Sequence, residues 1–389
     1  MRIHLGIEVL LQDPKSLLRD ARVGIVVHPA SVLPDLRHTA DALFNDADLR
    51  VTALFGPQHG ARGEKQDNMI ESAFYQDPDT GLPVHSLYSS TRRPTEEMLR
   101  DVDVLVFDLQ DVGTRVYTFI HTMAYCMEAC AQSGKRMIIL DRPNPINGVQ
   151  VEGNLLRTEY RSFVGLYPIP MRHGMTVGEL GELLNCEFGI RCDLTVVAMD
   201  GWERSMWFDQ TGLPWVQPSP NLPTLESATV YPGMVLVEGT HLSEGRGTTR
   251  PFEFVGAPYI SASDLAAHLN GLGLPGVFFR PAYFQPTFQK WAGAMCGGVQ
   301  LHVTDRSAFE PYLAGISAIS AVRGMYPDRF AWRDPPYEYE TEKLPIEILC
   351  GGPEIPRSIE NGTPLSEIRA SWQSELAQFL KVRARYLLY

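Results

Sequence analysis

The chain has 389 residues and a formal net charge of −12, which together indicate a two-domain protein that does not bind nucleic acid. A chain of this length exceeds a single typical hydrophobic core. Its 44% hydrophobic residues and the lack of a low-complexity tract predict a globular fold throughout. A nucleic-acid backbone or an anionic membrane requires a concentrated basic face, and the acidic composition argues against both partners.

The N-terminus and the cysteines bear on the cellular compartment. The first residues lack the charged region, apolar region and cleavage site of an export signal, and no apolar run is long enough to span a bilayer. The six cysteines are scattered without a zinc-type pair of CxxC motifs. We therefore expect a cytoplasmic protein with reduced, buried thiols, no metal site and no membrane partner.

An apolar strand at residues 102–107 that ends in two carboxylates, Asp108 and Asp111, is the centre of the predicted fold. The β-branched and aromatic run is typical of a strand buried on both faces of a parallel sheet. A helix is expected over residues 118–133. Ligands of open α/β sheets bind at the carboxyl ends of the strands, which makes both aspartates candidate site residues. The alternative is that each aspartate only caps the following helix.

The same strand-then-polar-turn design repeats along the first half of the chain. Helices are expected at residues 6–18, 36–45, 95–100 and 176–190, the last with a capping box between Thr176 and Glu179. Further strands are expected at residues 23–27, 50–55, 84–88, 136–140 and 192–199. The alternation predicts an α/β fold with a Rossmann-like, doubly wound parallel sheet. The sequence contains neither GxGxxG after the first strand nor GxxxxGK[ST], so we expect no nucleotide cofactor.

The second half of the chain has a less regular pattern. A strand is expected at residues 234–237, and the segment 65–94 reads as a long loop of the kind that forms lids. From about residue 261, helices at 263–269, 308–325 and 366–380 and strands at 277–281 and 298–303 predict a smaller α+β domain, with a proline-rich connector at 333–339. The expected domains are therefore residues 1–260 and 261–389.

The loop at residues 242–253 concentrates charges and glycines. Its glycines allow close approach of the backbone to a ligand, and Arg246 and Arg250 are candidates for holding a carboxylate through two hydrogen bonds each. The alternative is a surface turn closed by an ion pair of Glu244 with either arginine, and exposed pairs of this kind contribute little stability.

Taken together, the motifs at residues 55–60 (FGPQHG), 108–115 (DLQDVGTR), 141–145 (DRPNP) and 242–251 (LSEGRGTTRP) resemble those of the bacterial exo-β-N-acetylmuramidases. The resemblance covers nearly the whole chain. It implies a Rossmann-like domain, a smaller second domain and a cleft between them. It also implies hydrolysis of a terminal, non-reducing N-acetylmuramic acid from peptidoglycan fragments during recycling, without metal or nucleotide.

One position departs from this family. Many members carry glutamate as a candidate catalytic acid where this chain has Gln58. Because an amide does not exchange protons usefully near neutral pH, either another carboxyl group acts here or the reaction differs. The candidates for the acid are Glu64 and Asp111, with Asp108 preferred as the group that activates water or stabilises the transition state.

The remaining candidates orient these groups or hold the sugar. His59 and Tyr117 would orient the carboxyl groups; the sugar would be held by Gln58, Arg142, Asn144, Glu244, Arg246 and Arg250, with the lactyl carboxylate on Arg246 or Arg250. Two alternatives stay open: a sugar-binding or regulatory protein that lost the chemistry, and a hydrolase of a related acidic or acetamido sugar. The sequence does not indicate the oligomeric state.

Overall fold

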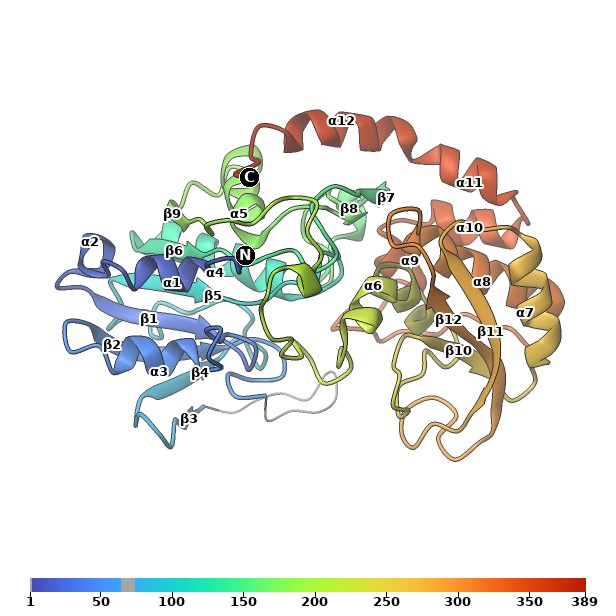
Figure 1. Cartoon of the computed structure of the whole chain (residues 1–389), viewed down its shortest axis with the longest axis horizontal. Coiled ribbons are helices and arrows are strands. Elements are labelled where there is room, and N and C mark those ends of the chain that lie inside the picture. The colour runs from blue at the N-terminus through green and yellow to red at the C-terminus, as the bar shows by residue number, and fades with distance from the viewer. Residues whose placement is uncertain (1, 64–73) are drawn as a thin grey trace.

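The computed structural model describes residues 2–63 and 74–389, and the chain forms two domains side by side (Figure 1). The first domain is built on a sheet whose strands run in the order β3-β4-β2-β1-β5-β6-β9. Neighbours from β4 to β9 are parallel, and β3 pairs with β4 antiparallel at the edge. Without β3, this is the strand order of the doubly wound Rossmann sheet, whose topological switch point lies between β1 and β5. The strands are β1 Arg22–Val27, β2 Arg50–Gly56, β3 Tyr75–Gln76, β4 Pro83–Ser86, β5 Val104–Asp108, β6 Arg136–Leu140 and β9 Asp193–Val197.

Side chains of the parallel strands alternate between two hydrophobic cores, one on each face of the sheet. Ile25 and Val106 belong to the core under α1 and α3, whereas Val26 and Phe107 belong to the core under α4 and α5. Because both faces are covered, the strands read as continuous apolar runs, as the sequence predicts. The helices of this domain are α1 Gly6–Leu10, α2 Lys15–Leu18, α3 Thr39–Phe44, α4 Phe119–Ser133 and α5 Val177–Glu187. The domain also contains a small hairpin, β7 Glu152–Leu155 with β8 Pro170–Arg172, and two 3₁₀ helices, η1 Thr158–Tyr160 and η2 Phe208–Gln210.

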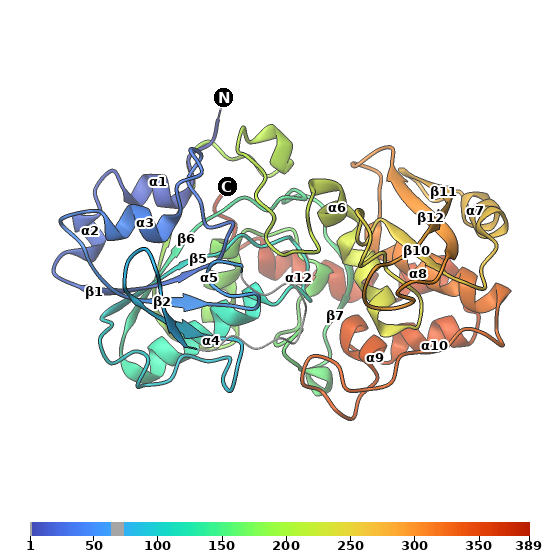
Figure 2. The same cartoon turned by 90° about the horizontal axis from the view of Figure 1, so that it is seen from below.

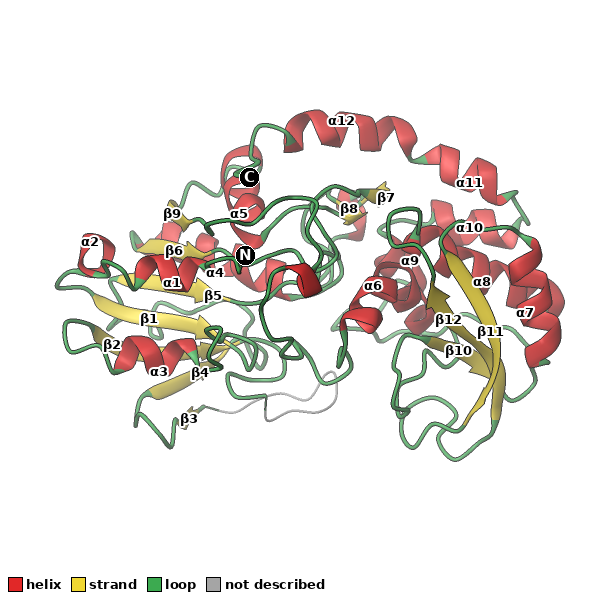
Figure 3. Ribbon diagram, viewed as in Figure 1, coloured by secondary structure: helices red, strands yellow, loops and turns green. Residues whose placement is uncertain are grey.

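The second domain packs helices against a small antiparallel sheet of order β10-β12-β11. Figure 3 shows that irregular segments gather between this domain and the main sheet. Several residues that line the candidate site described below lie in such segments. The elements are α6 Leu225–Met234, η3 Val235–Gly239, β10 Phe254–Ala257, α7 Ala262–Gly271, β11 Val277–Phe284, β12 Cys296–Val303, α8 Pro311–Met325, α9 Pro345–Cys350, α10 Glu354–Glu360, α11 Leu365–Ser371 and α12 Gln373–Arg383.

The C-terminal segment returns from the second domain to the first. Helices α11 and α12 cross above the junction of the two domains in Figure 1, and the view from below in Figure 2 shows α12 between the two domains. At the end of α12, the Arg383 guanidinium donates to the carbonyl oxygens of Gly148 and Gly174, and beyond the helix the Tyr389 hydroxyl donates to Asp141 at 2.6 Å. Residues from opposite ends of the chain therefore complete the first domain.

A second connection joins the hairpin of the first domain to α8. The carboxylate of Glu152 in β7 accepts hydrogen bonds from the backbone N–H groups of Tyr312, at 3.0 Å, and Leu313, at 2.9 Å. These are donors that the first turn of a helix leaves unpaired. Burial raises the pKa of Glu152 to about 7. The carboxylate thus fixes the start of α8 against the first domain.

The structure confirms the fold class and most expected elements. The capping box is present: Thr176 accepts from the Glu179 N–H, and the Glu179 side chain accepts from the Thr176 N–H at 3.0 Å. The expected strand at 234–237 is wrong, because these residues end α6 and form η3. A short apolar run that is buried all round does not distinguish strand from helix. Residues 95–100 form turns instead of a helix.

The division of the chain at residues 260 and 261 stays a prediction. Helix α6 and strand β10 both precede residue 260, yet α6 packs against α8 and β10 pairs with β12.

Candidate active site

The turn after β2 brings Gln58 and His59 to the carboxyl edge of the sheet. A Cβ added at Gly56 would lie 2.6 Å from the Ala61 nitrogen, so this tight turn requires glycine where it begins. The turn closes through a hydrogen bond from the Gly60 N–H to the Pro57 carbonyl at 2.9 Å. His59 has a φ of 73°, a left-handed conformation that few side chains adopt. The motif is therefore built to present two adjacent polar side chains.

Gln58 connects the first domain to a glutamate of the second. Its Oε1 accepts from the Thr118 hydroxyl at 2.8 Å, just before α4. Its Nε2 lies 3.4 Å from Glu338 Oε1 and 3.3 Å from the Tyr88 hydroxyl, to which it donates. Tyr88 in turn donates to Glu338 Oε2 at 2.9 Å. The two oxygens of one carboxyl group thus face two donors of the first domain.

Glu338 is the site residue that the sequence analysis missed. It lies in the proline-rich connector and has a φ of 45°. The residue is 4% exposed, and burial raises the pKa of its carboxyl group to about 7. The charge of Glu238 adds to the rise, and the hydrogen bond from Tyr88 opposes it. A carboxylic acid that stays partly protonated at neutral pH is suited to donate a proton. A glutamate between aromatic residues in a connector, Tyr337-Glu338-Tyr339, was the available signal.

Glu238, at the end of η3, has the opposite electrostatic character. Its Oε1 accepts from Arg246 Nη2 at 2.6 Å, and its Oε2 accepts from the Tyr337 hydroxyl at 2.7 Å. Burial alone would raise the pKa of this carboxyl group, but the Arg246 charge and these hydrogen bonds outweigh burial and hold the pKa below its usual value. Glu238 therefore stays ionised at neutral pH, where Glu338 is partly protonated.

Arg246 sits between two carboxylates and keeps one nitrogen unused. Its Nη2 pairs with Glu238, and its Nε lies 3.2 Å from Glu244 Oε1. Nη1 is buried and makes no hydrogen bond within the described residues. The second oxygen of Glu244 lies 2.7 Å from Lys290 Nζ. The result is a buried cluster of two anions and two cations with a spare donor.

A cavity between the domains brings Glu238, Glu338 and Arg246 together. It encloses about 30 Å³, which is room for about one water molecule and too small for a sugar. Of the predicted site residues, Gln58, His59, Tyr117 and Arg246 line it. The other lining residues are Val116, Thr118, Val164, Ser219, Tyr231, Glu238, Phe252, Tyr337 and Glu338.

Asp108 lies apart from this cavity. Its carboxylate is fully buried and pairs with Arg142, whose Nη2 donates to Oδ2 at 2.8 Å and whose Nε donates to Oδ1. The Thr39 hydroxyl also donates to Oδ2. The pair sits at the switch point, where the Ser31 hydroxyl donates to the Asp108 carbonyl. The crevice that holds a ligand in many Rossmann-like sheets is thus filled by the chain's own polar groups.

Asp111 and Asn144 hold the turns around them. Asp111 Oδ2 accepts from the Gly113 N–H at 2.7 Å and lies 3.2 Å from His173 Nε2. A Cβ on Gly113 would lie 2.5 Å from Asn144 Oδ1, which explains the glycine there. Asn144 donates to the Met175 carbonyl at 3.0 Å and accepts from the Ile146 N–H at 3.1 Å. Neither side chain lines the cavity.

Arg250 and Glu64 complete the list of sequence candidates. The Arg250 side chain is 46% exposed, and its Nη1 lies 3.4 Å from Glu253. This geometry matches the alternative of a turn closed by an ion pair, although the partner is Glu253 rather than Glu244. Glu64, and with it residues 65–73 of the expected loop at 65–94, lies outside the described residues.

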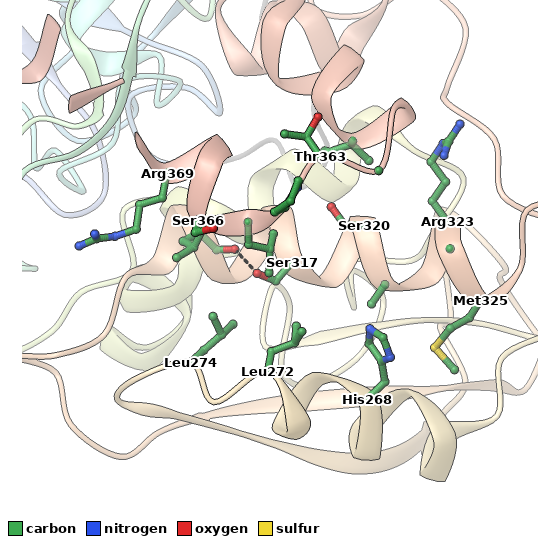
Figure 4. A pocket seen from close by; sticks show the side chains of 17 residues that line it. His268, Leu272, Leu274, Ser317, Ser320, Arg323, Met325, Thr363, Ser366 and Arg369 are labelled. Atoms are coloured by element: carbon green, nitrogen blue, oxygen red, sulfur yellow. Dashed lines mark hydrogen bonds between the residues drawn. The ribbon is translucent and has the colours of Figure 1, made fainter. Parts of the chain in front are cut away.

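A second cavity, of about 780 Å³, lies wholly within the second domain (Figure 4). Residues of α7, α8 and the α10–α11 region line it, including Leu272, Ser320 and Arg323. Its lining among the described residues contains no Asp or Glu, so the cavity offers no carboxyl pair for glycosidic chemistry.

Residues 2–63 and 74–389 contain no group of three or more histidine, cysteine, aspartate or glutamate side chains suited to a metal ion. None of the helices there has both the length and the apolar character of a membrane span.

Comparison with known proteins agrees with this architecture. The N-terminal model of the exo-β-N-acetylmuramidase NamZ family matches residues 23–226, and the C-terminal model matches residues 229–389. The chain is 50% identical over 388 residues to the peptidoglycan β-N-acetylmuramidase NamZ of Bacillus subtilis (strain 168), with 100% of this chain and 92% of that protein covered.

Two crystal structures of DUF1343 family proteins from Bacteroides fragilis NCTC 9343 have the same fold. The first has a TM-score of 0.91 at 38% identity, and the second a TM-score of 0.79 at 30% identity. In both comparisons, 100% of this chain and 99% of the other chain are covered. On the strength of both family models and the full-length identity, the chain belongs to the exo-β-N-acetylmuramidase NamZ family.

Proposed function

We propose that the chain is a glycoside hydrolase that releases terminal, non-reducing N-acetylmuramic acid from peptidoglycan fragments at the cavity between its domains. The full-length relationship to a β-N-acetylmuramidase supports the activity. The observation that carries the assignment of the site is the pairing of Glu238 with Glu338 around one cavity, with pKa values moved in opposite directions. Two titratable groups separated in this way can serve as acid and base in one reaction.

In the proposed reaction, Glu338 is the general acid. Its carboxyl group gives a proton to the glycosidic oxygen as the bond to C1 of the sugar breaks, so the leaving sugar departs as an alcohol. The Tyr88 hydroxyl and Gln58 amide hold the two oxygens of Glu338 and stabilise the carboxylate that remains. Gln58 therefore has a positioning role, which explains how an amide is compatible with catalysis at this place.

Glu238 is the ionised partner. It either attacks C1, giving a glycosyl-enzyme that water then hydrolyses, or removes a proton from a water that attacks C1 directly. In the first route the Glu338 carboxylate takes a proton from the attacking water and is restored directly. In the second route that proton goes to Glu238, and exchange with solvent then returns Glu238 to the carboxylate and Glu338 to the acid. The first anomer released, observed by ¹H NMR, distinguishes retention from inversion.

Arg246 supplies the contact that selects muramic acid. The lactyl ether of this sugar carries a carboxylate, and Arg246 Nη1 is a buried donor at the cavity with no partner among the described residues. A charge-assisted hydrogen bond there would distinguish the sugar from N-acetylglucosamine, which has no carboxylate. Because the enclosed space is about 30 Å³, the cavity walls must move apart to admit the sugar.

We further propose that the protein acts in the cytoplasm on fragments being recycled. All six cysteines are free, and five of them are buried, which suits a reducing compartment. Cell fractionation with an antibody to the native protein tests this location; recovery in the culture medium would contradict it.

The function is tested by incubating the purified protein with the disaccharide N-acetylmuramyl-N-acetylglucosamine and measuring free N-acetylmuramic acid. We expect release from this disaccharide and none from N,N′-diacetylchitobiose, which lacks the lactyl carboxylate. Cleavage of both would indicate a hydrolase of acetamido sugars in general. Binding without cleavage would indicate a sugar-binding protein.

A further inference from the structure

Lys290 reaches from the second domain's small sheet to the segment that carries Glu238. It lies in the loop between β11 and β12, and its ammonium group donates to the carbonyl oxygens of Val237 at 2.9 Å, Thr240 at 3.0 Å and Leu242 at 2.7 Å. An ammonium group has three N–H donors, and these three carbonyl groups, which lie within six consecutive residues, can accept all of them. The side chain is 17% exposed, so water competes weakly for these bonds.

The same loop holds the next stretch of that segment through its backbone. The Thr287 N–H and hydroxyl both donate to the Gly247 carbonyl at 2.9 Å, and the indole N–H of Trp291 donates to the His241 carbonyl at 2.7 Å. A Cβ on Gly247 would lie 2.7 Å from the Phe288 nitrogen. The segment from Val237 to Gly247 is therefore fixed along its length by the loop that bears Lys290.

Lys290 also balances charge within the site. Its Nζ lies 2.7 Å from Glu244 Oε2, while Arg246 contacts Glu244 Oε1 at 3.2 Å. Without this cation, Arg246 alone would face two buried carboxylates, and the cluster would carry a net negative charge. A buried charge without compensation is costly, and it repels an incoming anion.

We propose that Lys290 is a positioning residue for the hydrolysis, which keeps Glu238 and Arg246 in place and makes the cluster electrically neutral so that an anionic sugar is accepted. The inference rests on the proposed function, and it assigns to Lys290 no contact with the substrate. Electrostatic preorganisation of this kind depends on residues behind those that contact the substrate.

The charged and titratable groups around Glu238 determine the expected pH response. The cations Arg246 and Lys290 lower the pKa of Glu238, as does the hydrogen bond from Tyr337. Removing one cation must raise this pKa, so the acidic limb of the pH–rate profile must move to higher pH. Other groups that interact with Glu238 or Lys290 are Tyr231, Glu244, Arg333 and Glu338.

The experiment compares wild type with Lys290→Met, which keeps the length of the side chain and removes its charge. We expect a kcat lowered by about 100-fold, the scale of a small misplacement of a catalytic group, a raised KM for the muramyl disaccharide, and an acidic limb moved upward. Lys381→Met, on the exposed face of α12, is the matched control and should match wild type. An unmoved acidic limb in folded Lys290→Met would overturn the proposal.

A double variant separates charge from hydrogen bonding. Glu244→Gln combined with Lys290→Met restores charge balance without restoring the contacts to the carbonyl groups. We expect the acidic limb to return toward its wild-type position while kcat stays low. If Lys290→Met does not fold, Lys290→Arg is the alternative variant, because it keeps the positive charge. Its pH–rate profile must then have its acidic limb at the wild-type pH, and a displaced acidic limb would contradict the inference.

An activity-independent measurement distinguishes failure of this inference from failure of the proposed function. Titration of ¹³Cδ-glutamate-labelled protein by NMR, with Glu238→Gln used for assignment, reports the pKa of Glu238 directly. We expect a higher value in Lys290→Met than in wild type even if wild type releases no sugar. Equal values in the two proteins would overturn the role of Lys290, whatever the activity.

Discussion

Two buried carboxyl groups of this chain, those of Asp108 and Glu338, differ in what surrounds them. Asp108 lies at the switch point of the sheet, where it is fully buried and both carboxylate oxygens pair with Arg142. It does not line the cavity between the domains. Glu338 lies in an irregular connector, accepts hydrogen bonds from the neutral side chains of Gln58 and Tyr88, and lines the cavity together with the ionised Glu238. The partners of a carboxyl group, more than its place at a strand end, therefore indicate whether it transfers protons.

The largest expected effect is that of Glu338→Gln. Loss of the proton donor should lower kcat about 10³-fold, within the range of general acid catalysis. In wild type, activity should fall as the pH rises through about 7, because Glu338 loses its proton. A variant with unchanged turnover would remove Glu338 from the mechanism and return attention to the aspartates.

The same variant provides a stability test with a defined sign. The folded pKa of about 7 lies above the unfolded value of about 4.3, so the native state loses stability as the pH rises through this window. Glu338→Gln should therefore melt at a higher temperature than wild type at pH 8 and at the same temperature at pH 4. A uniform decrease at both pH values would indicate lost packing instead.

Asp108→Asn should have the complementary effect, on folding rather than on chemistry. Removing one partner of a buried ion pair costs about 3 kcal/mol or more, because it leaves Arg142 without its counter-charge. We expect a lower urea midpoint and, for the fraction that remains folded, turnover within about 10-fold of wild type. Folded protein that has lost turnover as fully as Glu338→Gln would make Asp108 catalytic after all.

A pair of conservative substitutions tests the two arginines of the glycine-rich loop. Arg246→Lys should raise KM for the muramyl disaccharide by about 10-fold, the scale of one charge-assisted hydrogen bond, since lysine lacks the planar fork. Arg250→Lys should leave KM unchanged, because Arg250 is half exposed and pairs with Glu253. Equal effects would contradict the distinction between them.

The smallest effect is expected from Gln58→Glu. A carboxyl group at this place would lie close to Glu338 Oε1, now 3.4 Å from the amide, and like charges raise the pKa of one another. The alkaline limb of the pH–rate profile should move upward, with little change at low pH. A downward shift would show that position 58 does not interact with the acid.

The sheet could be predicted from the sequence because each of its main strands has a local pattern of apolar residues. The runs at 22–27, 104–108 and 136–140 are apolar, β-branched and followed by turn residues, and the Thr176–Glu179 cap is readable from spacing alone. Sequence reasoning also placed Gln58, His59, Tyr117 and Arg246 in one site, and the structure brings these four together.

The rest depended on contacts between distant residues. Glu338 accepts a hydrogen bond from Tyr88, which lies 250 residues earlier in the chain. The connector that carries Glu338 has no periodicity, and no pattern in the sequence predicts this contact. Asp108 carries the expected signal of a catalytic aspartate, and only the positions of Arg142 and Thr39 reveal that its oxygens are already occupied. The family resemblance supplied the activity that these local patterns do not contain.

The return of the C-terminal segment to the first domain has a consequence for the order of folding. The buried carboxylate of Asp141 receives the Tyr389 hydroxyl across 248 residues, and the Glu152 carboxylate caps a helix 160 residues later. Contacts of such long range form late, and a nascent first domain therefore leaves the ribosome with its polar interior incomplete. We expect the two domains to melt as one cooperative unit, and a fragment that ends at residue 226 to be a poor substitute for the first domain.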